Sequence, residues 1–290
     1  MVATWFCAKK FAIVSMGKPI RKMPENSNNT VTAAALIIGD EILSGRTADK
    51  NIATIARACT EHGIALKEAR VIGDEKADII EAINALRKKY RYVFTSGGIG
   101  PTHDDITADA IAAAFGVDLQ VNKQALQMME QRYGKRDISP SRERMARIPQ
   151  GASLIKNPLT AAPGFRLENV MVMAGVPQIM EAMLGEIVPE LAGGETIFSA
   201  AIAVGVGESV IAQGLKSIQD EYGQVKIGSY PRLGKKAPIS GEKTFFGEVV
   251  LRSSDKVLLN EARAKVQALI DRAHKKHGVE LGDIAAKSNS

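Results

Sequence analysis

The sequence predicts an α/β protein of three layers, in which helices cover both faces of a mostly parallel sheet, followed by a smaller α+β domain. Between residues 31 and 192, short apolar runs alternate with segments of helical spacing, and this alternation is typical of parallel sheets. After Gly193-Gly194 the expected order becomes strand, helix, strand, strand, helix (β-α-β-β-α). We therefore predict domains at residues 31–192 and 195–275, a disordered extension at 1–30 and a frayed tail at 276–290.

The first domain opens with strands and helices in strict alternation. Val31 to Ile38 is an apolar run that predicts a strand buried on both faces, and Gly39 ends it. Ile52, Ile55 and Cys59 have the spacing of a helix over 51–62. Further strands are expected at 65–72, 92–95, near 153 and at 170–173, and further helices at 107–115, 123–133, 141–147, 177–191 and from a cap at Asp78. The second domain is expected to hold strands at 197–204, 225–230 and 245–251, and helices at 208–222 and 256–274.

Charge and composition argue against two classes of partner. The net charge is +6, but +4 of it lies in residues 1–30, so the rest of the chain is nearly neutral. A nucleic-acid partner is therefore not expected, and Arg232, Lys235 and Lys236 are interpreted as part of a solvated hairpin. No apolar run approaches the roughly 20 residues of a membrane span, and two cysteines suggest neither a disulfide framework nor a zinc site. We expect a cytoplasmic protein without a membrane partner.

A first candidate motif follows the first strand. It contains Gly39, Asp40 and Glu41, and Asp49 and Asn51 come soon after. Glycine permits a tight turn and the close approach of a ligand, while the carboxylates suit a hard divalent cation. The same residue types also serve as plain turn formers and helix caps, so the motif by itself leaves both interpretations open.

A second motif follows the strand at 92–95 and reads Ser96-Gly97-Gly98-Ile99-Gly100-Pro101-Thr102-His103-Asp104-Asp105-Ile106-Thr107. Its glycines allow main-chain N–H groups to converge on an oxyanion, and a helix beginning near Thr107 adds its positive N-terminal end. The two aspartates are candidates for metal binding or for helix capping. The motif is neither a P-loop nor a Rossmann fingerprint.

These two motifs resemble the signatures of the MoaB/MogA molybdopterin-binding fold, and the long form of the second resembles the N-terminal domain of the CinA branch. The resemblance covers about residues 31–192, and the segments at 207–209 and 227–231 resemble the middle domain of CinA. The chain leaves no room for the C-terminal deamidase domain of that branch, so we expect a protein without it. Two segments depart from the family pattern, at 157–165 and at 173–180, where a glycine and a carboxylate are replaced.

The resemblance implies a metal-dependent nucleotide pyrophosphatase that hydrolyses the diphosphate of ADP-ribose, FAD or a similar dinucleotide. Two alternatives stay open: adenylyl transfer to molybdopterin, and non-catalytic binding of a nucleotide or pterin phosphate. The cofactor is expected to be Mg²⁺ or Co²⁺, and a homo-oligomer, dimer or trimer, is expected by family analogy. The resemblance assigns catalysis to Asp40, Asp104 and Asp105, and the metal to the same three residues with Glu41. It assigns ligand binding to Gly39, Asp49, Asn51, Ser96, Gly97, Gly98, Gly100, Pro101, Thr102, His103, Thr107, Gly164 and Pro177.

Overall fold

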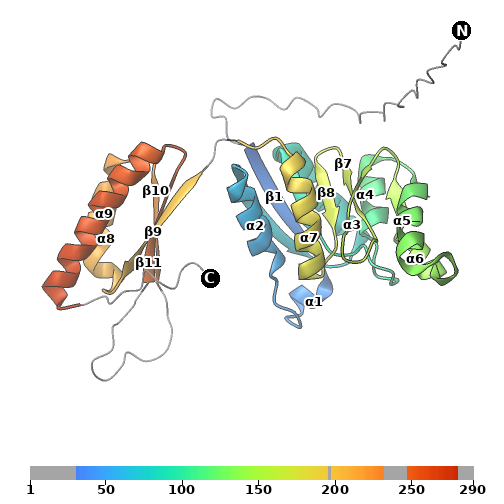
Figure 1. Cartoon of the computed structure of the whole chain (residues 1–290), viewed down its shortest axis with the longest axis horizontal. Helices are drawn as coiled ribbons and strands as arrows, with labels where there is room; N and C mark the ends of the chain where they lie inside the picture. The colour runs from blue at the N-terminus through green and yellow to red at the C-terminus, as the bar shows by residue number, and fades with distance from the viewer. Residues whose placement is uncertain (1–30, 195–196, 232–246, 280–290) are drawn as a thin grey trace, which may run out of the picture. The chain divides into compact units, whose positions relative to one another are not determined.

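The computed structural model describes residues 31–194, 197–231 and 247–279. The chain forms two compact units, divided between Gly194 and Glu195 (Figure 1). The extension expected at 1–30 and the cationic segment at 232–236 lie outside the described residues.

The first unit is built on a six-stranded sheet in the order β2-β1-β3-β8-β7-β6. The strands β1 (Val31–Ile38), β2 (Ile64–Ile72), β3 (Tyr92–Ser96) and β8 (Val170–Met173) run parallel. The strands β7 (Gly164–Leu167) and β6 (Ser153–Ile155) extend the sheet in antiparallel fashion. The mostly parallel sheet predicted from the sequence is therefore confirmed.

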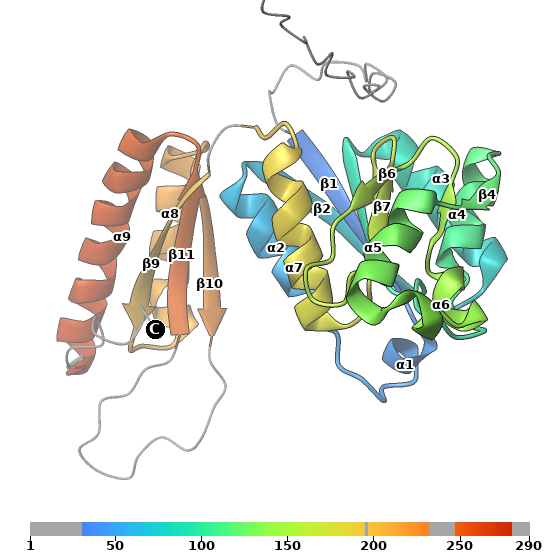
Figure 2. The same cartoon turned by 45° about the vertical axis from the view of Figure 1, so that its right-hand side comes forward.

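Helices cover both faces of this sheet, as the three-layer prediction requires. One face carries α2 (Asn51–Glu61) and α7 (Pro177–Ile187), and the other carries α3 (Lys76–Lys89), α4 (Thr107–Phe115) and α5 (Lys123–Tyr133) (Figures 1 and 2). In the central strand β1, successive buried residues from Ala33 to Ile38 alternate between the two cores. Because both faces are buried, the strand has no polar alternation in its sequence.

Several local predictions were wrong at element ends. The helix α3 begins at Lys76, so Asp78 lies in its first turn and does not cap it. The helix expected at 141–147 is the short α6 (Pro140–Arg144), which the Ser139 side chain caps by accepting a hydrogen bond from the Arg142 N–H. The residues after it form β5 (Arg147–Pro149), which pairs with β4 (Leu119–Val121). The strand that pairs with residues 147–149 lies far away in the sequence. Local spacing therefore does not reveal that these residues leave the helix and form a strand.

Other boundaries shifted by a few residues. The loop expected at 157–165 gives way to β7 at Gly164, because this glycine pairs with Ile155 of β6. The helix expected at 177–191 ends at Ile187, where a 3₁₀ turn, η2 (Val188–Glu190), follows. A further 3₁₀ turn, η1 (Lys135–Asp137), and a short helix, α1 (Asp40–Leu43), were not predicted.

The second unit has the predicted β-α-β-β-α order. It consists of β9 (Phe198–Val204), α8 (Glu208–Glu221), β10 (Lys226–Pro231), β11 (Gly247–Ser253) and α9 (Lys256–His277). Its three strands form an antiparallel sheet in the order β10-β11-β9, and both helices contribute to one apolar core with it. The helix α9 continues to His277, past the expected start of the tail at 276.

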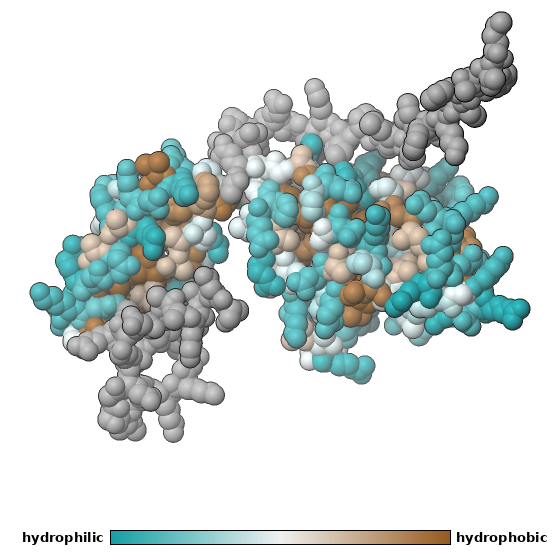
Figure 3. All heavy atoms as spheres, viewed as in Figure 1, coloured by the Kyte–Doolittle hydropathy of each residue, from teal (hydrophilic) through white to brown (hydrophobic). Residues whose placement is uncertain are grey.

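The surface is largely hydrophilic on the face shown in Figure 3. Within the ranges that the structure describes, no helix combines the length and the apolar character that crossing a bilayer requires.

Candidate functional site

The parallel strands β1, β2, β3 and β8 end side by side, and we call this margin of the sheet the strand-end edge. The register places Ile38 beside Ile72, and Ser96 beside both Ile37 and Met173. Each strand is followed at once by a glycine or a small residue, and both sequence motifs begin there. Ligands of open parallel sheets bind at such an edge, beyond the carboxyl ends of the strands.

Gly97 lets the two motifs approach each other closely. A Cβ atom on Gly97 would lie 2.0 Å from the main-chain oxygen of Ile38, and its φ of +112° lies in a region that other residues rarely adopt. A Cβ atom on Gly175 would lie 3.3 Å from the Cα of Gly97. The floor of the site is therefore formed by main chain, so main-chain groups rather than side chains face a ligand at this point.

Carboxylates from three different strand ends gather beside this floor. The Asp74 carboxylate accepts a hydrogen bond of 3.0 Å from the Asp40 N–H, and the Asp40 carboxylate accepts one of 3.4 Å from the Asp74 N–H. Partial burial raises the pKa of Asp74, the hydrogen bond from the Asp40 N–H opposes this, and the nearby carboxylates of Asp40, Glu41 and Asp104 add to the rise. We call Asp40, Glu41, Asp74 and Asp104 the acidic cluster. Its mutual repulsion is the kind of electrostatic strain that a bound cation relieves.

Asp74 belongs to the site but was missed from the sequence. It follows β2 after Gly73, as Asp40 follows β1 after Gly39. A glycine and an aspartate directly after a strand of a parallel sheet were a usable signal, because all such strand ends share one edge.

Asn51 and Asp49 hold the start of α2 against the strand-end edge. The buried Asn51 side chain donates hydrogen bonds of 2.8 Å to the Ser96 hydroxyl and 2.8 Å to the Gly175 oxygen, and Ser96 donates one to the Ala174 oxygen. The Asp49 carboxylate accepts from the N–H groups of Asn51 and Ile52, which is a helix-capping arrangement. Within the described residues the buried Oδ1 of Asn51 has no hydrogen-bond partner.

The second motif forms an ordered turn, which we call the glycine loop (residues 97–106). The buried Thr107 hydroxyl donates to the Gly97 oxygen at 3.0 Å, and the Thr107 N–H donates to the Gly98 oxygen at 3.0 Å. No hydrogen bond among the described residues uses the N–H groups of Gly98, Ile99 and Gly100. Three consecutive free amide donors are the arrangement that a phosphate group needs.

The two aspartates of the glycine loop differ in their partners. The Asp105 carboxylate accepts hydrogen bonds from the Thr102 N–H, at 2.8 Å, and from the Thr102 hydroxyl. Asp105 therefore shapes the loop. Asp104 is fully exposed, and the nearby Thr102 hydroxyl lowers the pKa of its carboxyl, with a smaller contribution from His103. Asp104 therefore stays ionised and free to contact a cation.

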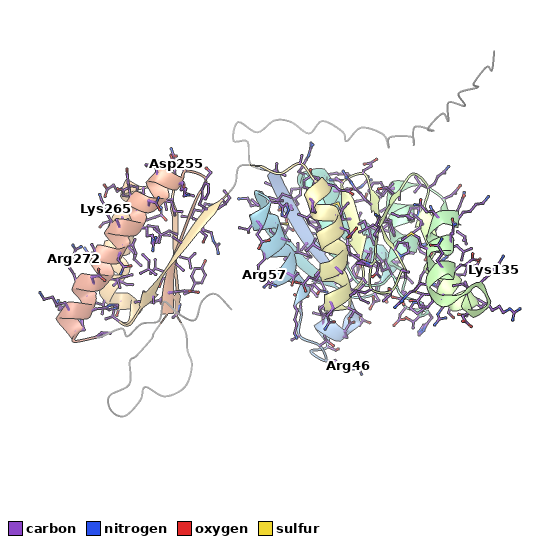
Figure 4. The ribbon with its side chains drawn as sticks, viewed as in Figure 1. Arg46, Arg57, Lys135, Asp255, Lys265 and Arg272 are labelled. Carbon is purple, nitrogen blue, oxygen red and sulfur yellow. The ribbon has the colours of Figure 1, made fainter. Side chains whose placement is uncertain are left out.

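The remaining predicted site residues lie at varied depths. Pro101 and His103 are exposed on the glycine loop, and Pro177 is exposed at the first turn of α7. Gly164 is buried inside β7, where a Cβ atom would lie 2.2 Å from the Val172 oxygen, so it serves close packing of the sheet. Arg46, labelled in Figure 4, lies in the exposed loop between α1 and α2.

The donors of the acidic cluster suit a hard cation, since carboxylate oxygens are the ligands that Mg²⁺ prefers. Among the described residues, however, no group of three or more His, Cys, Asp or Glu side chains is spaced to bind one ion together. A cation at this cluster would therefore need other ligands, such as phosphate oxygens, beside one or two carboxylates.

Comparison with known proteins gives the family of the chain. Residues 34–193 match the family model described as a probable molybdopterin binding domain. The chain belongs to this family. Residues 196–277 match a second model, described as the middle domain of FAD synthase, so the two matches follow the two units of the structure.

Archaeal relatives extend over most of the chain. A protein of Thermoplasma acidophilum is 33% identical over 258 residues, which cover 86% of this chain and 97% of the relative. A protein of Aeropyrum pernix is 33% identical over 265 residues, which cover 87% of this chain and 96% of that protein. A solved structure, described as the protein CinA with unknown function from Thermoplasma acidophilum, is 35% identical. It aligns with a TM-score of 0.53 and covers 56% of this chain and 99% of the solved chain.

Proposed function

We propose that the chain is a metal-dependent nucleotide pyrophosphatase, which hydrolyses the diphosphate of ADP-ribose, FAD or a similar dinucleotide. The observation that carries the proposal is the juxtaposition of two groups of opposite character at one edge. Free amide donors of the glycine loop suit phosphate oxygens, and the acidic cluster suits a divalent cation. The match of the second unit to the middle domain of FAD synthase supports a dinucleotide ligand.

Different residues of the site would bind the phosphate, hold the metal and accept a proton. The N–H groups of Gly98 to Gly100 would orient one phosphate, and Asp40 and Asp104 would hold Mg²⁺ or Co²⁺. A bound divalent cation neutralises charge on the attacked phosphate and lowers the pKa of a coordinated water. Asp74, whose pKa is raised, is suited to accept the proton that the attacking water loses.

The test is release of AMP from ADP-ribose or FAD by the full chain, with Mg²⁺ or Co²⁺ and with a chelator. We expect release that requires the metal, and a fall in kcat of about 100-fold or more in Asp40→Asn and Asp104→Asn. Asp118→Asn is the matched control, because Asp118 is an exposed aspartate whose carboxylate makes no hydrogen bond among the described residues. Unchanged release in the first two variants would show that the acidic cluster is not the site.

A second candidate is binding of molybdopterin, with or without adenylyl transfer, and the family match at residues 34–193 favours it. The departing segment at 157–165 remains ordered, because the buried Asn157 side chain bonds to Leu159, Thr160 and Ala162. The segment thus keeps a hydrogen-bonded conformation in spite of the sequence change. A molybdopterin-dependent rise in melting temperature without any AMP release would favour this candidate over hydrolysis.

A further inference from the structure

The glycine loop and the α6–β5 segment line a common pocket. Its lining residues include Gly98 and Gly100 of the loop, Arg144 and Arg147 of the α6–β5 segment, and Phe165 of β7. The pocket volume is about 10 Å³, which is room for about one water molecule or one ligand oxygen. The pocket thus admits a single oxygen of a larger group that lies outside it.

The two arginines of this pocket differ in their partners. Arg147 donates two hydrogen bonds to the Asp109 carboxylate, at 3.2 Å and 2.8 Å, so its charge is paired in a bidentate manner. The nearest carboxylate oxygen to Arg144 belongs to the same Asp109 and lies 3.9 Å away, beyond hydrogen-bonding distance. The Asp109 carboxylate therefore lies near two guanidinium groups, and it is hydrogen-bonded to that of Arg147 only.

Most donors of Arg144 remain without partners. Its Nη2 donates to the main-chain oxygen of Asp105 at 3.1 Å, and its buried Nε, like that of Arg147, has no partner among the described residues. A guanidinium carries five N–H donors, and leaving buried donors unpaired costs free energy. Asp105 also lines the pocket, and its Oδ2 accepts hydrogen bonds from Thr102. Arg144 therefore brings to the pocket lining more N–H donors than the described residues have acceptors for.

Arg144 lines the same pocket as Gly98, Ile99 and Gly100, whose N–H groups make no hydrogen bond among the described residues. We propose that Arg144 is a phosphate-binding residue, which donates charge-assisted hydrogen bonds to an oxygen of the phosphate that the Gly98 to Gly100 amides hold. Arg147 contributes indirectly. Because it is paired with the Asp109 carboxylate, Asp109 does not fully neutralise the charge of Arg144. This inference rests on the proposed function for the identity of the ligand, a nucleoside diphosphate or monophosphate.

The alternative role for Arg144 is structural, since its bond to the Asp105 oxygen ties the glycine loop to α6. Arg142 offers a matched control on the same helix. It also donates a single hydrogen bond to a main-chain oxygen, that of Asp137 at 2.8 Å, and it does not line the pocket. A merely structural role would lower the melting temperature of the ligand-free protein in both variants and leave ligand affinity unchanged.

The experiment measures binding of AMP and of inorganic pyrophosphate to the full chain by titration calorimetry, with melting temperatures of the free proteins. We expect Arg144→Met to raise Kd about 10-fold or more, Arg144→Lys to recover part of the loss, and Arg142→Met to leave Kd within about twofold. Wild-type affinity in Arg144→Met overturns the inference, and so does absence of AMP and pyrophosphate binding in the wild type. Arg144→Met could fail to fold, and Arg144→Lys then gives the test. If Arg144→Lys and the wild type have the same Kd at raised salt, the phosphate-binding role of Arg144 is also overturned.

Failure of the proposed function gives a different result. A wild-type protein that binds AMP through Arg144 but releases no AMP from ADP-ribose or FAD would refute hydrolysis and leave the phosphate-binding role of Arg144 intact.

Discussion

The two sheets of this chain differ in where their polar groups lie. In the first unit four of the five described buried polar residues, Asn51, Thr95, Ser96 and Thr107, gather at the strand-end edge next to the acidic cluster, and the fifth is Asn157. In the second unit the described buried polar residues are Ser253 and His274, which lie apart, at the end of β11 and near the end of α9. Parallel strands bring all their carboxyl ends to one margin, whereas antiparallel strands send them to opposite margins. The concentration of polar groups at one edge is thus a consequence of strand direction.

The largest effect is expected from Gly97→Ala, because the added Cβ would prevent the close approach of Gly97 to the end of β1. The added Cβ would lie 2.0 Å from the Ile38 oxygen, and the φ of +112° is unsuited to alanine. We expect a loss of about 3 kcal/mol or more in the free energy of unfolding, measured by urea titration.

The control for this change is Gly185→Ala, inside α7, where a new Cβ would meet no atom within 4 Å. We expect that variant to gain about 0.5–1 kcal/mol, since alanine is the better helix former. Equal effects of the two substitutions would mean that close approach is not what the glycine loop requires.

A smaller loss is expected from Asn51→Ala, which removes the two hydrogen bonds that join α2 to Ser96 and Gly175. The buried Ser96 hydroxyl would lose one of its two hydrogen bonds and the Gly175 oxygen would lose its bond to α2, so we expect a loss of about 2 kcal/mol in the free energy of unfolding. Asn260→Ala, at an exposed position of α9 in the second unit, should change it by less than about 0.5 kcal/mol. Similar losses in both variants would remove the distinction drawn between the two units.

The smallest effect is expected from a change of pH in the second unit. The buried His274 Nε2 accepts a hydrogen bond of 2.9 Å from the Gly205 N–H, so the neutral ring is the form that fits. Burial lowers the pKa of His274 below its usual 6.5, and Asp271 opposes this in part. As pH falls, His274 takes up a proton more readily in the unfolded chain than in the folded one. The free energy of unfolding therefore decreases below about pH 6.5, the usual histidine pKa.

This pH dependence can be measured as the free energy of unfolding between pH 8 and pH 5. The variant His274→Gln keeps a hydrogen-bond acceptor without titrating in this range, so its curve should be flatter than that of the wild type. His277→Gln is the control, because His277 is exposed in the last turn of the same helix. A wild-type slope in His274→Gln would refute the assignment.

Much of the fold could be predicted from local patterns, and the errors share one cause. Long helices with apolar spacing, such as α4 at Thr107–Phe115 and α5 at Lys123–Tyr133, were predicted at their observed bounds. The short strands β4 and β5 were missed, because three residues carry too little periodicity and their pairing joins segments far apart in sequence. At the site, Asp40 and Asp104 were named from their motifs, while Asp74 and Arg144 stand outside any motif.

The sequence by itself determined the alternation of elements, the positions of the glycines and the presence of carboxylates after β1 and β3, since these depend on neighbours along the chain. Only the tertiary structure decided which charges remain available. Asp105 is engaged by Thr102, Asp49 caps α2, and Arg147 takes most of the Asp109 carboxylate. The role of an ionisable side chain is set by the partners within a few ångströms of it, and most of those partners are brought there by folding.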